Sequence, residues 1–78
     1  MMDSNTFRGV RLRKKMSQAR FAEFLGVSES TVAAIEKGRR NISDTVRARL
    51  AEKIAFDDSL ISFLESYEKI NKIVHYKL

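Results

Sequence analysis

The sequence predicts an all-α fold of five helices within one small domain of 78 residues. Its apolar residues recur at intervals of three and four, which is the spacing of one helix face, and the alternation typical of strands is absent. Proline does not occur, and serine, asparagine or aspartate precedes each apolar segment, where a side-chain oxygen can cap a helix. These capping residues divide the chain into the five helical segments.

The first predicted helix spans residues 6–14, with Asn5 or Ser4 as its N-cap. Gly9 falls in the middle of this helix, where glycine costs about 1 kcal/mol relative to alanine. We expect Gly9 to be exposed, and we expect Asp3 to lie in a mobile tail before the helix.

Two short helices follow with very few residues between them. Ser17 caps the first of them over residues 18–25, and Gly26 ends it, because a residue without Cβ adopts the left-handed conformation readily. Ser28 caps the second, which ends at Gly38. Two helices joined by so tight a turn must cross at a steep angle, which is the helix-turn-helix arrangement.

The remaining chain predicts two longer helices. Ser43 caps the fourth helix, over residues 44–55, and Asp57 or Asp58 caps the fifth, over residues 59–75. Both helices carry an apolar stripe, and the stripe of the fifth is the wider one.

The charge is distributed unevenly along the chain, whose net charge is +5. Residues 1–56 carry twelve lysines and arginines against six acids, whereas residues 57–78 carry three lysines against four acids. A basic first part suits an acidic partner, and a near-neutral last helix indicates a second role within one fold. The alternative is that the basic residues only keep a small protein in solution.

The composition also excludes several classes of protein. There is no cysteine and only one histidine, so we expect neither a disulfide scaffold nor a metal site, and no cofactor. No run approaches the ~20 apolar residues of a membrane span, and the N-terminus does not resemble a secretory signal. With no nucleophile–histidine–acid set, we do not expect an enzyme.

Residues 18–37, QARFAEFLGVSESTVAAIEK, resemble the helix-turn-helix of the lambda-repressor-like, or XRE/Cro-type, DNA-binding family. The small Ala22 lies where the two helices cross, Gly26 makes the turn, and the ending EKGRRN at residues 36–41 is typical of the family. The resemblance covers residues 5–56 and implies a five-helix lambda-repressor-like DNA-binding domain.

The resemblance also suggests how the domain is organised. Residues 1–78 would form a single domain, with a DNA-binding core at 5–56 and a C-terminal helix for dimerisation at 57–78. Two positions depart from the family. Lys15 stands where glycine is common, so the first helix would end differently, and Ile42 stands where proline often precedes the fourth helix.

The resemblance implies that residues 28–37 form the recognition helix, lying in a major groove ~12 Å wide. The residues expected at base edges are Glu29, Ser30, Thr31, Ala33 and Ala34. An ionised carboxylate only accepts hydrogen bonds, so Glu29 suits a cytosine amino group or orients an arginine. Alternatively, it only stabilises the first turn of its helix.

Phosphate contacts are expected from polar and basic residues at both ends of the motif. They are Gln18, Arg13, Lys14, Ser28, Lys37, Arg39, Arg40 and Asn41. For the basic residues, the alternative is a solvated loop without a ligand. Arg11 and Glu36 match a pair that the family uses as a structural ion pair, and not as a DNA contact.

The fifth helix is expected to form a homodimer interface. So small a domain cannot cover the whole apolar stripe of this helix, and exposed apolar patches usually mark interfaces. The interface residues would be Phe63, Leu64, Tyr67, Ile70 and Val74, unless all five pack internally. A dimer would place two recognition helices ~34 Å apart, which suits a palindrome.

The sequence therefore predicts a sequence-specific regulator of double-stranded DNA, acting as a homodimeric repressor on a palindromic operator. It would be cytoplasmic, associated with the nucleoid when bound to DNA, and similar to phage repressors or restriction-modification controller proteins. One alternative is an antitoxin that binds its own promoter and a toxin. Another is a helical module that binds protein and not DNA, which would leave Gln18, Arg39 and Arg40 without a reason.

Overall fold

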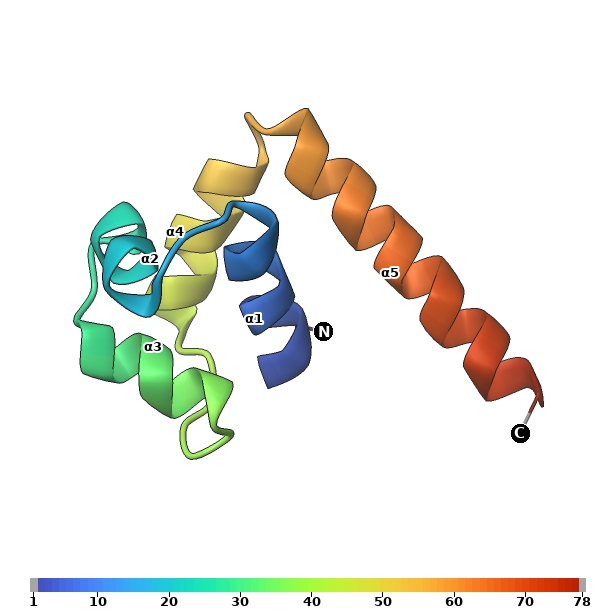
Figure 1. The fold of residues 1–78 in the computed structure, drawn as a ribbon, viewed down its shortest axis with the longest axis horizontal. Helices are drawn as coiled ribbons and strands as arrows, with labels where there is room; N and C mark the ends of the chain where they lie inside the picture. Colours follow the sequence, from blue (N-terminus) through green and yellow to red (C-terminus); the bar gives the residue numbers. More distant parts are fainter. Residues whose placement is uncertain (1, 78) are drawn as a thin grey trace.

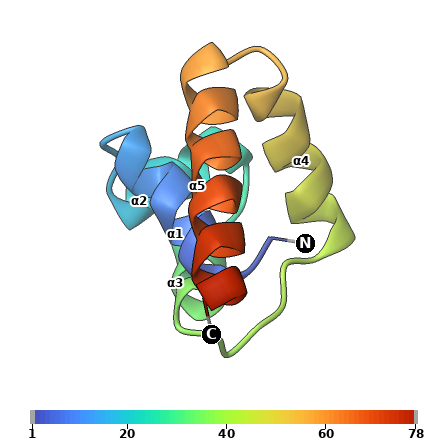
Figure 2. The ribbon, with the colours of Figure 1, turned by 90° about the vertical axis from the view of Figure 1, so that its right-hand side faces the viewer.

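The computed structural model describes the backbone of residues 2–77 and the side chains of residues 2–70. The described residues form five helices, which confirms the predicted all-α fold: α1 (Ser4–Arg13), α2 (Gln18–Leu25), α3 (Glu29–Glu36), α4 (Asp44–Ile54) and α5 (Asp58–Lys77). The first four helices gather into one body, and α5 runs back alongside α1 and then diverges from it (Figures 1 and 2).

Helix α1 begins two residues earlier than the sequence indicated. Asp3 is the N-cap, and its carboxylate accepts a hydrogen bond of 2.8 Å from the backbone N–H of Thr6. This hydrogen bond lowers the pKa of Asp3 below its usual value. The choice of Asn5 or Ser4 as cap, and the placing of Asp3 in a mobile tail, were therefore wrong. The earlier start buries Thr6 on the inner side of the helix.

Just after α1, Lys15 adopts the left-handed conformation although it has a side chain. Lys15 has φ +56°, so the expectation that this helix would end differently without glycine was wrong. The amide of Met16 donates to the carbonyl of Arg11 at 3.2 Å, and that of Lys15 donates to the carbonyl of Leu12 at 3.0 Å. These bonds satisfy carbonyls that the helix leaves free, as in a Schellman ending.

The turn between α2 and α3 has the predicted chemistry. Ser17 and Ser28 cap the two helices through their hydroxyl oxygens, and Gly26 has φ +71°. Arg49 of α4 covers this turn and donates to the carbonyls of Leu25 and Gly26, both at 3.2 Å. A Cβ at Gly26 would meet the Arg49 guanidinium, which is the movable end of a long side chain, so the positive φ is the main constraint that favours glycine here.

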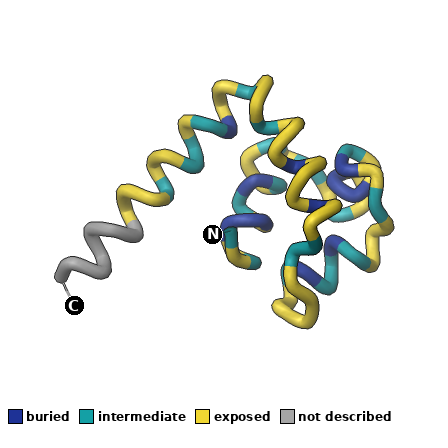
Figure 3. The backbone as a smooth tube through the Cα atoms, turned by 180° about the vertical axis from the view of Figure 1, so that it is seen from behind, coloured by how far each residue is buried: buried dark blue, intermediate teal, exposed yellow. Residues whose placement is uncertain are grey.

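One apolar core joins the helices. The buried residues come from all five: Phe7, Val10, Phe21, Ala22, Leu25, Val32, Ile35, Val46, Leu50 and Leu60. The rings of Phe7 and Phe21 meet edge to face with centroids 5.2 Å apart, which fixes α1 against α2. Burial is concentrated in the body and reaches the start of α5, whereas the next turns of α5 are more exposed (Figure 3).

Gly9 lies where the Phe63 ring of α5 packs on α1. A Cβ at this position would lie 2.8 Å from the tip of the Phe63 ring, so Gly9 is not the exposed residue that the sequence suggested. The missing side chain leaves room for the aromatic ring on the surface of α1. A glycine that weakens its own helix thus allows another helix to pack.

Helix α5 begins at a carboxylate with two partners. Asp57 accepts a hydrogen bond of 3.1 Å from the backbone N–H of Leu60, and its other oxygen lies 2.8 Å from the ammonium of Lys14. Arg13 adds a 3.2 Å hydrogen bond to the hydroxyl of Ser59. The end of α1 is therefore joined to the start of α5.

Among the described residues, no helix is both long and apolar enough to cross a membrane.

Candidate nucleic-acid interface

Helix α3 lies at the edge of the body with one face turned to solvent (Figure 1). Val32 and Ile35 are buried and hold it against the core. The helical period places Ser30, Ala34 and Lys37 on the opposite side. Ser30 and Lys37 are exposed and Ala34 is half-buried, so this face is small, polar and accessible.

The other residues expected at base edges lie beside this face. Glu29 is exposed, whereas Thr31 and Ala33 are half-buried. The small side chains allow another backbone to approach α3 closely, and the longer Glu29 stands at the start of the helix. The surface therefore offers one carboxylate and two hydroxyls for hydrogen bonding, the hydroxyls belonging to Ser30 and Thr31.

Hydroxyl groups cluster around the beginning of α3. The Ser28 oxygen lies 3.1 Å from the Ser30 oxygen and 2.8 Å from that of Thr31, and it also accepts from the backbone N–H of Thr31 at 3.2 Å. Arg40 reaches the same cluster, with 3.5 Å between its guanidinium and the Thr31 hydroxyl. The loop that follows α3 thus returns a positive charge to the first turn of the helix.

The loop that follows α3 is basic and exposed. Gly38 turns the chain with φ +74°, and the N–H of Arg39 donates to the carbonyl of Ala34 at 3.0 Å. Lys37, Arg39, Arg40 and Asn41 are all exposed. Guanidinium and ammonium groups in this arrangement suit phosphate oxygens.

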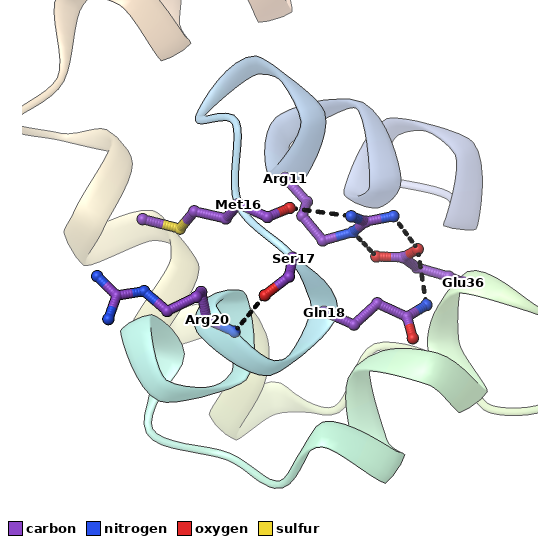
Figure 4. A network of polar contacts seen from close by, with 6 residues as sticks. All are labelled: Arg11, Met16, Ser17, Gln18, Arg20 and Glu36. Atoms are coloured by element: carbon purple, nitrogen blue, oxygen red, sulfur yellow. Dashed lines mark hydrogen bonds and ion pairs between the residues drawn. The ribbon is translucent and has the colours of Figure 1, made fainter.

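An ion pair joins α1 to the end of α3 (Figure 4). Arg11 donates to both carboxylate oxygens of Glu36, from Nε at 2.7 Å and from Nη2 at 3.0 Å, and its Nη1 donates to the carbonyl of Met16 at 3.0 Å. The side chains are only 12 % and 5 % exposed. Gln18, the first residue of α2, donates from Nε2 to the same carboxylate at 3.2 Å. The structure brings Arg11, Gln18 and Glu36 together at the junction of three helices.

A comparison with protein families decides the nature of this domain. A family model described as helix-turn-helix matches residues 8–57, which is most of the chain. The chain belongs to the lambda-repressor-like, XRE-type helix-turn-helix family. It is thus a DNA-binding helix-turn-helix regulator. No curated protein and no solved structure matches it significantly.

Two of the cations expected at phosphates lie away from α3. Lys14 pairs with Asp57 and Arg13 donates to Ser59, so both side chains face the start of α5. The structure does not bring them to the α3 face. The other candidates, apart from Gln18, belong to the cap of α3 and to its following loop.

The residues expected at a dimer interface divide into three groups. Phe63 and Leu64 pack partly against the core of the helix-turn-helix domain. Tyr67 is half-buried, with its ring centroid 6.0 Å from that of Phe63, and Ile70 is 60 % exposed. The side chain of Val74 lies outside the described residues. As far as the structure describes the side chains, the stripe therefore runs from the core to the surface.

Some notable contacts carry no signal in the sequence. Arg49 caps the α2–α3 turn, and Lys53 lies 5.1 Å from the centroid of the Phe24 ring. Phe56, just after α4, is 90 % exposed. The two contacts join residues that are distant along the chain, and the exposure of Phe56 depends on the direction of its side chain, which the sequence does not give. In the part of the chain that the structure describes, no group of three metal-ligating side chains occurs.

Proposed function

We propose that this regulator is a repressor that binds a palindromic operator as a homodimer, with α3 in the major groove. The observation that carries the proposal is the exposed face of α3, a helix that the buried Val32 and Ile35 anchor to the core and that the basic loop flanks. A helix of this kind can present short side chains to base edges while neighbouring cations hold the backbone.

The proposed contacts fall into two classes. Base edges are read by Glu29 and Ser30, with Thr31, Ala33 and Ala34 supplying close packing. Phosphates are held by Gln18, Ser28, Lys37, Arg39, Arg40 and Asn41. Arg13 and Lys14 are engaged at the start of α5 and contribute less to this set.

Dimerisation is proposed through α5. One short recognition helix contacts only a few base pairs, which is too little for a specific site, whereas two of them ~34 Å apart double the sequence that is read. The exposed Ile70 and the half-buried Tyr67 continue the apolar stripe beyond the part that the body covers. A second copy of this stripe is the proposed partner, and Phe63 and Leu64 support it from the core side.

The proposal is tested by selecting bound DNA from a random pool at about 150 mM salt, where non-specific binding is weakened. We expect an enriched palindrome with half-sites about one helical turn apart. Retention without an enriched sequence would contradict sequence-specific binding. Repression is then tested by placing the selected site across a promoter and measuring the transcript, and an unchanged transcript would contradict the repressor role.

A further inference from the structure

Gln18 has one of its amide hydrogens already committed within the protein. Its Nε2 donates to Glu36 at 3.2 Å, and the side chain is half-buried. An ionised carboxylate can only accept hydrogen bonds, so the amide must turn its NH₂ group, and not its carbonyl, toward Glu36. Figure 4 shows the Gln18 carbonyl turned away from the ion pair. The chemistry of Glu36 therefore fixes which way round the amide lies.

Arg11 makes it possible to place a carboxylate at this point. Its two hydrogen bonds to Glu36 balance the charge of the acid, and its third, to the Met16 carbonyl, holds the guanidinium in place. Hydrogen bonds to an ionised group in a largely buried setting are strong and well oriented. Because the Arg11 charge balances that of the ionised Glu36, Glu36 can orient Gln18 without repelling a phosphate nearby.

We propose that Glu36 is a positioning residue for DNA-backbone binding. It holds the Gln18 amide by one Nε2 hydrogen, so that the second hydrogen is presented in a fixed direction to a phosphate oxygen. This inference rests on the proposed function, because it assumes that the surface around α3 meets DNA. It assigns to the buried ion pair an effect on affinity in addition to its effect on folding.

A double-mutant cycle tests the inference on a duplex of about 20 base pairs at low salt, since a phosphate contact needs no particular sequence. Gln18→Ala should weaken binding about tenfold, the loss expected for a hydrogen bond to a charged group. Glu36→Gln should cause a loss of the same order, because an amide at this position no longer dictates the orientation of Gln18. In the Gln18→Ala background, Glu36→Gln should cause no further loss.

The salt dependence separates this contact from an ionic one. Gln18 is uncharged, so Gln18→Ala should leave the slope of log K against log salt unchanged. Arg39→Ala is the matched control, and it should make the slope shallower. If Arg39→Ala weakens binding but Gln18→Ala does not, the inference about Glu36 is overturned while the proposed function stands. If neither variant has an effect, the proposed function itself fails.

A spectroscopic measurement on the unaltered protein covers the case in which Glu36→Gln does not fold. The Nε2 proton of Gln18 that is not bonded to Glu36 should change its NMR shift when the duplex is added. Losses that add fully in the double variant, or Gln18 amide protons that do not respond to the duplex, would overturn the positioning role.

Discussion

At the scale of single residues, the Arg11–Glu36 pair combines strong attraction with a costly environment. Its side chains are largely removed from water, so the gain from the ion pair is offset by the loss of hydration. Removing one partner keeps that loss and abolishes the attraction. Removing one partner therefore destabilises the fold by much more than the intact pair stabilises it.

Glu36→Ala should lower the free energy of unfolding by about 3 kcal/mol or more, because the Arg11 charge is left largely buried with only the Met16 carbonyl. For so small a domain this corresponds to a fall in Tm of more than about 10 °C. Thermal unfolding followed by circular dichroism measures it. Glu29→Ala, an exposed acid at the other end of the same helix, is the control. An unchanged Tm for Glu36→Ala would contradict the prediction.

Lys15→Gly should stabilise the protein. Lys15 adopts φ +56°, a conformation that costs a residue with a side chain roughly 1–2 kcal/mol, and the greater freedom of glycine in the unfolded chain offsets part of this gain. We expect a net increase of about 0.5–1 kcal/mol in urea unfolding. Arg8→Gly, within α1, should instead destabilise by about 1 kcal/mol. If both variants lose stability, Lys15 is not strained.

At the scale of helices, the position of α5 depends on a small joint at the end of α1. Asp57 caps α5 and pairs with Lys14, Leu60 is fully buried, and the Phe63 ring lies over Gly9. These contacts fix the first two turns of α5 to the body. The direction in which the rest of the helix leaves the body is set by this joint.

Asp57→Asn should weaken the joint between α1 and α5 and make the stability of the protein less dependent on pH. The hydrogen bond from Lys14, followed by that from the Leu60 backbone, lowers the pKa of Asp57 below its usual 3.8. A lowered pKa contributes stability that is present above the usual value and is lost as the pH falls through the folded one. Unfolding curves between about pH 7 and pH 2 should therefore show a smaller acid loss for Asp57→Asn than for the unaltered protein. Asp58→Asn is the neighbouring control, and equal acid losses in all three proteins would contradict this role.

Sequence reasoning found the helices because their signals are local. The caps at Ser17, Ser28 and Ser43 and the turn at Gly26 each depend on residues within one turn of helix, and the structure confirms them. The cap of α1 was misplaced because Asp3, Ser4 and Asn5 all have capping side chains. Burial of Thr6 against the rest of the molecule favours one of them, and burial is not a local property.

The contacts that hold α5 and the turn could not be predicted from the sequence. Gly9 and Phe63 are far apart in the chain, and nothing in either segment indicates that a ring needs the space of a missing Cβ. Arg49 is likewise one of several arginines, and only the fold places it over the carbonyl of Gly26. The polar surface of α3 was predictable through the family resemblance, whereas the hydrogen bond from Gln18 to Glu36 required the structure.

At the scale of the whole molecule, the two ends of the domain have different surfaces. The basic loop and the polar face of α3 lie on one side, and the exposed part of α5 lies beyond the other helices (Figure 1). A dimer formed through α5 therefore need not cover α3. The same separation makes it possible to disturb the proposed dimer without touching the proposed DNA contacts.

Ile70→Asp should convert the proposed dimer into a folded monomer. Ile70 is 60 % exposed, so the substitution leaves the core intact but places a charge in the proposed apolar interface. Sedimentation equilibrium measures the mass, and circular dichroism confirms that the helices remain. Lys69→Asp, at the exposed position just before Ile70, should remain dimeric. A dimeric Ile70→Asp would show that the interface lies elsewhere.

Salt dependence connects the two surfaces in one measurement. If Lys37, Arg39 and Arg40 each neutralise one phosphate in each subunit, a dimer on its operator should give a slope of log K against log salt of about −5. Ile70→Asp has all the DNA-binding residues of one subunit, so a monomer on a half-site should give about half of that slope. A slope shallower than about −2 for the unaltered protein would contradict the proposed phosphate contacts. If the unaltered protein and Ile70→Asp both give the full slope, the phosphate contacts stand and the dimer interface lies outside α5.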